Sequence, residues 1–130
     1  MDSRVRLVRP EERWPEVASG SMTREAGISK ITAGSEGIYM AVVLLPPGHS
    51  STPHSHSNCE SAIYVMSGQG KFLCGQDLGV ALDITAGDCL YVPPGAVHQP
   101  VNDGTEPITL IVARNTQEEV VVEYRPGGTS

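Results

Sequence analysis

The sequence predicts an all-β fold in a single domain, and three observations support this. Short apolar runs rich in β-branched and aromatic residues follow one another at intervals of about 8 to 12 residues. The 14 glycines and 10 prolines are scattered between these runs, where they are typical of turns. Convincing helical periodicity is absent from every 11-residue window, and 130 residues suffice for one domain but not for two.

The first 45 residues contain two runs that favour strands. Val5 and Leu7 alternate with arginines, which predicts an edge strand, and Trp14 in the polar stretch that follows is expected to act as an apolar plug. Residues 38–45 read IYMAVVLL and favour a strand, because β-branched and aromatic residues fit a pleated sheet. A Pro-Pro-Gly turn ends this strand, since proline cannot donate to a strand ladder.

The rest of the chain continues the rhythm of strand and turn. Residues 61–67 and 71–74 are apolar runs joined through Ser-Gly-Gln-Gly, which predicts a hairpin of two paired strands. Further strands are expected at VALDI (80–84), DCLYVPP (88–94), VHQPV (97–101), ITLIVAR (108–114) and the final run at 120–124. The sequence therefore predicts a succession of antiparallel strands.

Charge and hydropathy exclude two classes of partner. Nine basic residues face 15 acidic ones, and the net charge of −6 offers no basic surface to the phosphates of a nucleic acid. No apolar run approaches the roughly 20 residues that span a bilayer, and the N-terminus lacks the apolar core of a signal peptide. We therefore expect neither a nucleic-acid nor a membrane partner, and a cytoplasmic protein.

We expect the three cysteines to be reduced thiols. Cys59, Cys74 and Cys89 are odd in number and show no C-x-x-C spacing. This disfavours both a disulfide framework and a cysteine-ligated zinc site.

Three of the four histidines lie in two short segments, PHSHSNCE at residues 53–60 and PPGAVH at residues 93–98. Because side chains two positions apart on a strand share a face, His54, His56 and Glu60 are expected to point the same way. His98 belongs to a different strand, which a sheet folded on itself can bring opposite the first three. Three imidazoles and one carboxylate suit one divalent ion of iron, manganese, nickel, cobalt, copper or zinc.

The second histidine segment carries a motif that spans 16 residues. Gly87 is followed after five residues by Pro93, then Gly95, His98 and, after three more residues, Asn102. This chain thereby resembles the cupin superfamily, whose second motif is G-x5-P-x-G-x2-H-x3-N. Every defined position of that motif is matched.

The first cupin motif, G-x5-H-x-H-x3,4-E-x6-G, is matched with one departure. The opening glycine, His54, His56 and Glu60 comply, but the closing glycine is Gly68, one residue late. Two explanations are open. Either the strand after Glu60 carries a bulge or a longer turn, or Ser61 occupies the glutamate position and the carboxylate is displaced.

The resemblance implies a double-stranded β-helix, or jelly-roll, barrel with one metal ion and the substrate in its mouth. It implies a barrel over residues 36–125, preceded by an N-terminal strand and loop extension at 1–35 that packs on it. Residues 126–130 form an expected flexible tail. Members of this superfamily are often dimeric, so a homodimer is expected.

The expected function is that of a metal-dependent enzyme acting on a small organic molecule. The leading prediction is a dioxygenase in which the substrate chelates the metal, because the 3-His, 1-Glu set resembles that of cupin dioxygenases. One alternative is a non-oxidative isomerase, lyase or polyketide cyclase. Another is a non-catalytic barrel that binds or senses a small molecule.

Two residues are the predicted catalytic groups. Strand alternation from Glu60 aims Tyr64 into the barrel and places Ile63 and Val65 on the opposite side, so Tyr64 is the candidate hydroxyl facing the substrate. Glu60 is the second candidate for moving a proton. His49 lies outside both motifs and is expected at the surface.

Overall fold

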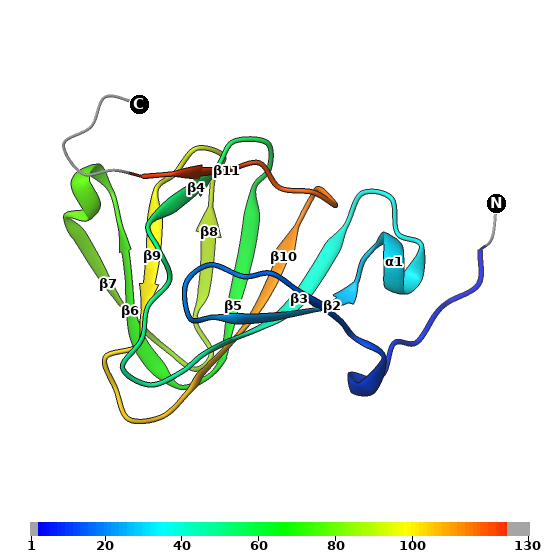
Figure 1. Cartoon of the computed structure of the whole chain (residues 1–130), viewed down its shortest axis with the longest axis horizontal. Helices are drawn as coiled ribbons and strands as arrows, with labels where there is room; N and C mark the ends of the chain where they lie inside the picture. Colours follow the sequence, from blue (N-terminus) through cyan, green and yellow to red (C-terminus); the bar gives the residue numbers. More distant parts are fainter. Residues whose placement is uncertain (1–2, 125–130) are drawn as a thin grey trace.

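The computed structural model describes residues 3–124 (Figure 1). The chain forms two antiparallel β-sheets whose inner faces share one core, which confirms the predicted all-β jelly-roll class. The larger sheet has the order β1 (Trp14–Glu16), β2 (Thr23–Ile28), β3 (Tyr39–Leu45), β10 (Ile108–Arg114), β5 (Ser61–Ser67) and β8 (Cys89–Val92). The smaller sheet has the order β11 (Val121–Glu123), β4 (His54–His56), β9 (His98–Val101), β6 (Gln69–Cys74) and β7 (Val80–Thr85).

Helical structure is limited to three short pieces in the described residues: η1 (Pro10–Glu12), α1 (Lys30–Ala33) and η2 (Gln76–Leu78). Ser29 caps α1, because its hydroxyl oxygen accepts a hydrogen bond from the Thr32 backbone N–H. Within residues 3–124, none of these helices has the length or apolar character needed to cross a bilayer.

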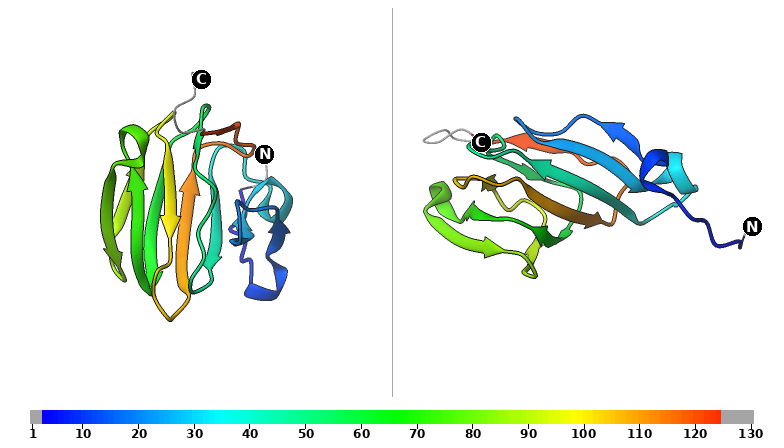
Figure 2. Two further views of the ribbon diagram at one scale, coloured as in Figure 1. Left: turned by 60° about the vertical axis from the view of Figure 1, so that its left-hand side comes forward. Right: turned by 90° about the horizontal axis from the view of Figure 1, so that it is seen from below.

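The N-terminal segment contributes two strands to the larger sheet rather than a strand at Val5 and Leu7. Both of those side chains are exposed, and residues 3–9 make no strand pairing in the described structure. β1 occupies the sheet edge instead, and β2 pairs with β3 along most of its length (Figure 2). Trp14 lies on β1 and is half exposed, so it does not act as an apolar plug. The predicted tail at 126–130 lies outside the described residues.

The predicted hairpin between residues 61–67 and 71–74 is wrong. Both strands exist, but β5 pairs with β8 and β10 in the larger sheet, while β6 pairs with β7 and β9 in the smaller one. Gly68 marks this change of sheet: its φ is +89°, and a Cβ atom there would lie 2.5 Å from the Pro107 carbonyl oxygen. Only glycine fits such a crossing without strain.

The core fills the space between the two sheets, and strand alternation explains its composition. β3 and β5 each turn every second residue inward. The buried cluster takes residues from both sheets: Val43, Leu45, Ile63, Val65, Phe72, Ile84, Val92, Ile108 and Leu110. This core supports the inner wall of the histidine site described below.

Asn102, the last residue of the second motif, is fully buried. Its side-chain amide donates to the carbonyl oxygens of Leu45 and Glu106, 3.0 and 2.8 Å away, and its Oδ1 accepts from the Gly104 N–H. Because buried backbone carbonyls need donors, this side chain fixes the turn between β9 and β10.

Candidate metal centre

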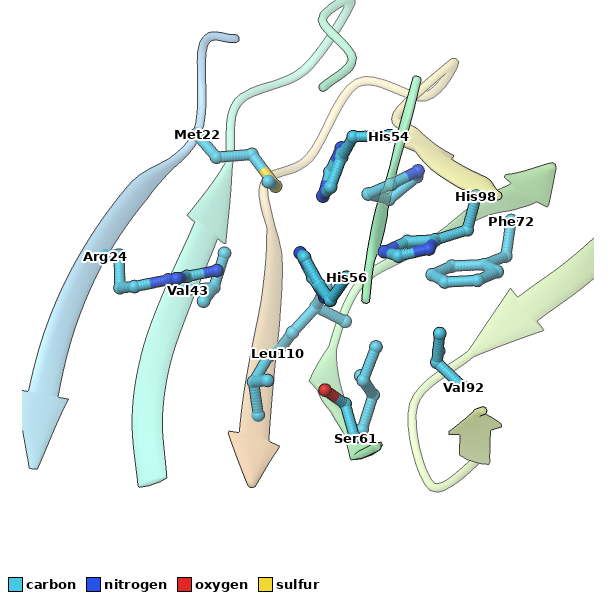
Figure 3. Close-up of a pocket in the computed structure, with 13 residues that line it drawn as sticks. Met22, Arg24, Val43, His54, His56, Ser61, Phe72, Val92, His98 and Leu110 are labelled. Carbon is cyan, nitrogen blue, oxygen red and sulfur yellow. The ribbon is translucent and has the colours of Figure 1, made fainter. Parts of the chain in front are cut away.

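Three histidines from two strands face one another inside the barrel (Figure 3). β4 and β9 are antiparallel neighbours, and their register places His54 directly opposite His98. His56 shares a face of β4 with His54 because it lies two residues further on. The ring centroids are 4.7 to 5.2 Å apart, and one ring nitrogen from each residue lies within 4.8 Å of the other two.

Two of the three rings are oriented by backbone carbonyls. His54 Nδ1 lies 2.6 Å from the Thr52 oxygen, and His98 Nδ1 lies 2.9 Å from the Ala96 oxygen. A carbonyl oxygen only accepts, so each Nδ1 carries the proton and each Nε2 keeps a free lone pair. The ring of Phe72 stacks on His98 at an interplanar angle of 7° and holds it from the other side.

The site favours neutral imidazoles. Burial lowers the pKa of His98 to about 4, an effect that the nearby His54 and His56 reinforce and the Ala96 carbonyl partly opposes. Burial also lowers the pKa of His56, more strongly than the charge of Glu119 raises it. Both nitrogens of His56 are buried and make no hydrogen bond.

These observations fit a divalent transition metal. Neutral imidazole nitrogens with free lone pairs are the form in which histidine binds metals. Buried polar atoms without partners are rare in folded proteins, and an ion bound here would use one of the two His56 nitrogens. The three histidines could therefore hold one ion.

The histidines lie on the wall of a small cavity of about 40 Å³. Most of the remaining lining is apolar: Met22, Val43, Ile63, Phe72, Val92, Pro100, Leu110 and Val112. A second hollow of about 220 Å³ also reaches His54, and its lining is mixed: Val17, Ala18, Ser19, Arg24, Thr52, Glu119, Val121 and Glu123. The cluster thus borders a largely apolar cavity and a hollow that contains charged side chains.

Glu60 is not part of the cluster, in contrast to its prediction as a ligand. β4 ends at His56 and residues 57–60 form a turn, so strand alternation does not carry on to Glu60. The side chain of Glu60 is exposed, and its backbone N–H donates to Asn115 Oδ1. Ser61 is buried and lines the cavity instead.

Ser61 therefore occupies the place of the motif glutamate. Four residues separate it from His56 and six separate it from Gly68, so the first motif fits in this register without a late glycine. Of the two explanations left open by the sequence, the structure agrees with the displaced carboxylate.

Comparison with known proteins identifies the family. The family profile described as "Cupin domain" matches residues 41–114, more than half of the chain. The chain is a cupin. The predicted resemblance to the cupin superfamily is confirmed.

Two curated plant proteins illustrate the relatives of this cupin. The "Rhicadhesin receptor" of Pisum sativum is 31% identical over 101 residues, which is 75% of this chain and 46% of that protein. "Nectarin-1" of Nicotiana plumbaginifolia is 28% identical over 101 residues, 75% of this chain and 44% of its own length. The chain spans less than half the length of these relatives.

Solved structures of similar fold include two bacterial proteins. The polyketide cyclase RemF from Streptomyces resistomycificus has a TM-score of 0.79 at 20% identity and covers 98% of this chain and 88% of its own. A predicted oxalate decarboxylase from Thermotoga maritima has a TM-score of 0.71 at 26% identity and covers 85% of this chain and 99% of its own. At such identities the first likeness concerns the fold alone.

Tyr64 points away from the cupin site, contrary to the prediction. It lies on the outer face of β5 and is 45% exposed, while Ile63 and Val65 are buried in the core. The turn at 57–60 shifts the alternation of β5 by one residue relative to the prediction, which inverts its two faces. His49 is exposed as predicted, with Nδ1 beside the Pro47 carbonyl oxygen.

Sequence reasoning missed the charged group beside the histidines. Glu119 Oε1 accepts a hydrogen bond from Arg24, and Oε2 lies 3.1 Å from Arg114 and 3.3 Å from His56 Nε2. Burial raises the pKa of Glu119, but the charge and hydrogen bond of Arg24, together with His56 and Arg114, bring it below its ordinary value. Glu119 belongs to neither motif, so only the absence of a motif carboxylate could have prompted a search for it.

Proposed function

We propose that this cupin is a metal-dependent enzyme acting on a small organic molecule, with one divalent transition metal ion on His54, His56 and His98. The observation that supports this is the convergence of three buried imidazoles on the wall of a largely apolar cavity. The ion supplies Lewis acidity and, where it is redox-active, electron transfer to a bound small molecule.

The residues of the chain prepare the site for such chemistry. The carbonyls of Thr52 and Ala96 hold the Nδ1 sides of His54 and His98, which leaves both Nε2 atoms free to bind an ion. Most of the remaining lining is apolar, and electrostatic interactions strengthen in apolar surroundings. Glu60, Tyr64 and His49 do not line this cavity, so none of them is placed to move a substrate proton there.

Dioxygenase chemistry remains the leading proposal for the reaction. Three or four protein donors leave three or two positions on an octahedral ion, enough for a chelating substrate or for O2. Non-oxidative chemistry is the second candidate, and the name of one solved neighbour, a predicted oxalate decarboxylase, favours it.

Reconstitution with single metals tests the proposal. We expect the metal-free protein to bind one equivalent of Fe(II) or Mn(II) anaerobically and then to consume O2 when a chelating substrate such as a vicinal diol or a 2-oxo acid is added. Turnover without O2 consumption would indicate the non-oxidative class. Binding of such molecules without turnover by any metal form would indicate a binding protein, and absence of metal binding would overturn the proposal.

The outer face of the larger sheet carries exposed apolar side chains on neighbouring strands: Met40, Leu44, Tyr64, Met66 and Tyr91. The strand registers place Met40 and Tyr91 in one row across the sheet, since Met40 pairs with Ala113, which pairs with Ala62, which pairs with Tyr91. Exposed apolar patches of this kind are typical of interaction surfaces. We propose that a second copy of the chain covers this face.

Sedimentation equilibrium tests the homodimer. We expect twice the monomer mass of 13.8 kDa for the wild type and the monomer mass for Tyr91→Lys, because a buried unpaired charge opposes association. Ile31→Lys, on α1 and away from this face, should remain dimeric. A monomeric wild type at micromolar concentration would contradict the proposal.

A further inference from the structure

The missing motif carboxylate raises the question of what completes the donor set. Ser61 occupies its place, and Glu60 is exposed. We propose that Glu119, from the segment between β10 and β11, is the carboxylate ligand of the metal centre. This inference rests on the proposed metal-binding function and adds a ligand that lies outside both cupin motifs.

Hydrogen bonds fix the segment that carries Glu119 against β4. The side chain of Asn58, in the turn after β4, donates to the Glu118 carbonyl and accepts from the Val120 N–H, so it holds the backbone on both sides of Glu119. β11 then pairs with β4 and sets Val121 opposite His56. Glu119 is therefore held beside the histidines by its own backbone.

Arg114 fixes the same segment from the other side. Its guanidinium donates to the carbonyls of Thr116 and Gln117 and stacks on the ring of Tyr39, 3.6 Å from the centroid. Gln117 in turn donates to the Ile38 carbonyl and accepts from the Lys30 N–H. A segment without regular secondary structure is thus rigidly placed, as a ligand-bearing segment must be.

The contact between Glu119 and His56 has the separation expected of two ligands of one ion. The ligand atoms of Glu119 group with those of His56 and Cys59, and a shift of its side chain would join it to His54 and His98. Oε2 lies 3.3 Å from Nε2, yet Nε2 makes no hydrogen bond, so the oxygen lies off the axis along which the ring nitrogen donates. Two donors that each bind an ion at about 2.1 Å are about 3.0 to 3.4 Å apart for right-angled to tetrahedral arrangements. A hydrogen-bonded partner would lie on the axis instead.

The two carboxylate oxygens are used differently. Oε1 accepts the hydrogen bond from Arg24 at 2.8 Å. Oε2 is close to Arg114 as well as His56, but neither the Arg114 Nη1 nor the His56 Nε2 reaches it in hydrogen-bonding geometry. The oxygen nearest the histidines thus keeps a lone pair for an ion.

Charge favours the same assignment. Arg24, Arg114 and a divalent ion would bring four positive charges to a largely buried region, and Glu119 is the carboxylate that contacts both arginines there. Cys59 is a competing donor, because its sulfur lies within 4.8 Å of ligand atoms of His56 and Glu119. Of these two donors, Glu119 is the one that contacts both arginines, so charge compensation favours it as the ligand.

Metal titration of variants tests the assignment. We expect Glu119→Gln to weaken Co(II) and Mn(II) binding by more than about 100-fold. Loss of a residue that only hydrogen-bonds a metal ligand typically costs roughly 10- to 100-fold. The visible spectrum of the Co(II) form should change as well. Glu118→Gln, the exposed neighbour, and Glu60→Gln should bind like the wild type. Adding Ser61→Glu to Glu119→Gln should restore affinity to within about 10-fold of the wild type, because it returns a carboxylate to the motif position.

Two outcomes distinguish a ligand role of Glu119 from a purely structural role, and from a failure of the proposed metal binding itself. If Glu119→Gln lowers the melting temperature of the metal-free protein but leaves metal affinity and the Co(II) spectrum unchanged, Glu119 only neutralises the arginines and the inference is overturned. Glu119→Asp keeps that charge, shortens the reach, and should still lose affinity. A wild type that binds no metal would refute the proposed function itself.

Discussion

The variant His98→Ala is expected to bind no stoichiometric metal and to lose all the stability that metal adds to the wild type. The reason is that the two remaining histidines both come from β4, so the ion loses its link to β9. Ligation that exists only in the folded state adds its binding energy to folding, and an ion at 1,000 times its dissociation constant contributes about 4 kcal/mol.

Elemental analysis and thermal unfolding with and without metal measure this effect. Removing the His98 ring also leaves a gap beside Phe72, which lowers the melting temperature whether or not metal is present. The informative quantity is therefore the difference between the melting temperatures of one protein with and without metal. His49→Ala, in an exposed loop, is the matched control and should keep the full difference. Full metal content in His98→Ala would exclude the three-histidine assignment.

Arg114→Met is expected to destabilise the metal-free protein by about 3 kcal/mol, in the range typical of breaking a buried ion pair. Arg114 is 7% exposed and donates to the carbonyls of Thr116 and Gln117, which would lose their donors. Methionine fills much of the volume and contacts Tyr39, so the loss reports mainly on the hydrogen bonds and on the charge facing Glu119.

Urea unfolding of the metal-free form measures the change in the free energy of unfolding. If the dependence of that free energy on urea concentration is unchanged, the variant and the wild type expose similar surface on unfolding and can be compared directly. Arg13→Met is the matched control, because the ion pair of Arg13 with Glu25 is partly exposed and surface pairs contribute about 1 kcal/mol or less. An Arg114→Met variant as stable as Arg13→Met would show that the segment carrying Glu119 is held without Arg114.

Local alternation predicted the strands well because each depends on neighbours in sequence. The apolar runs that become β3, β5, β7, β8, β9 and β10 are recognisable from β-branched residues and flanking turns. The same logic failed at residues 57–60, where a turn interrupts the strand and inverts which face of β5 is buried. For this reason strand alternation places Glu60 and Tyr64 on the wrong face.

Strand pairing is a non-local property, and there the sequence was less informative. The Ser-Gly-Gln-Gly connection between β5 and β6 has the composition of a hairpin, yet Gly68 carries the chain from one sheet to the other. Composition reports the local turn, whereas the partner of each strand depends on how apolar faces are buried across the whole barrel.

By itself, the sequence determined the all-β class from local apolar runs and turns, and the cupin family and the three histidines from the spacing within the two motifs. Only the tertiary structure decided that Ser61 replaces the motif carboxylate, that Glu60 and Tyr64 face away, and that Glu119 lies beside His56. Glu119 is 63 residues from His56 along the chain, and the pairing of β11 with β4 brings them together. No local pattern encodes such a contact, because it arises from the packing of elements that are remote in sequence.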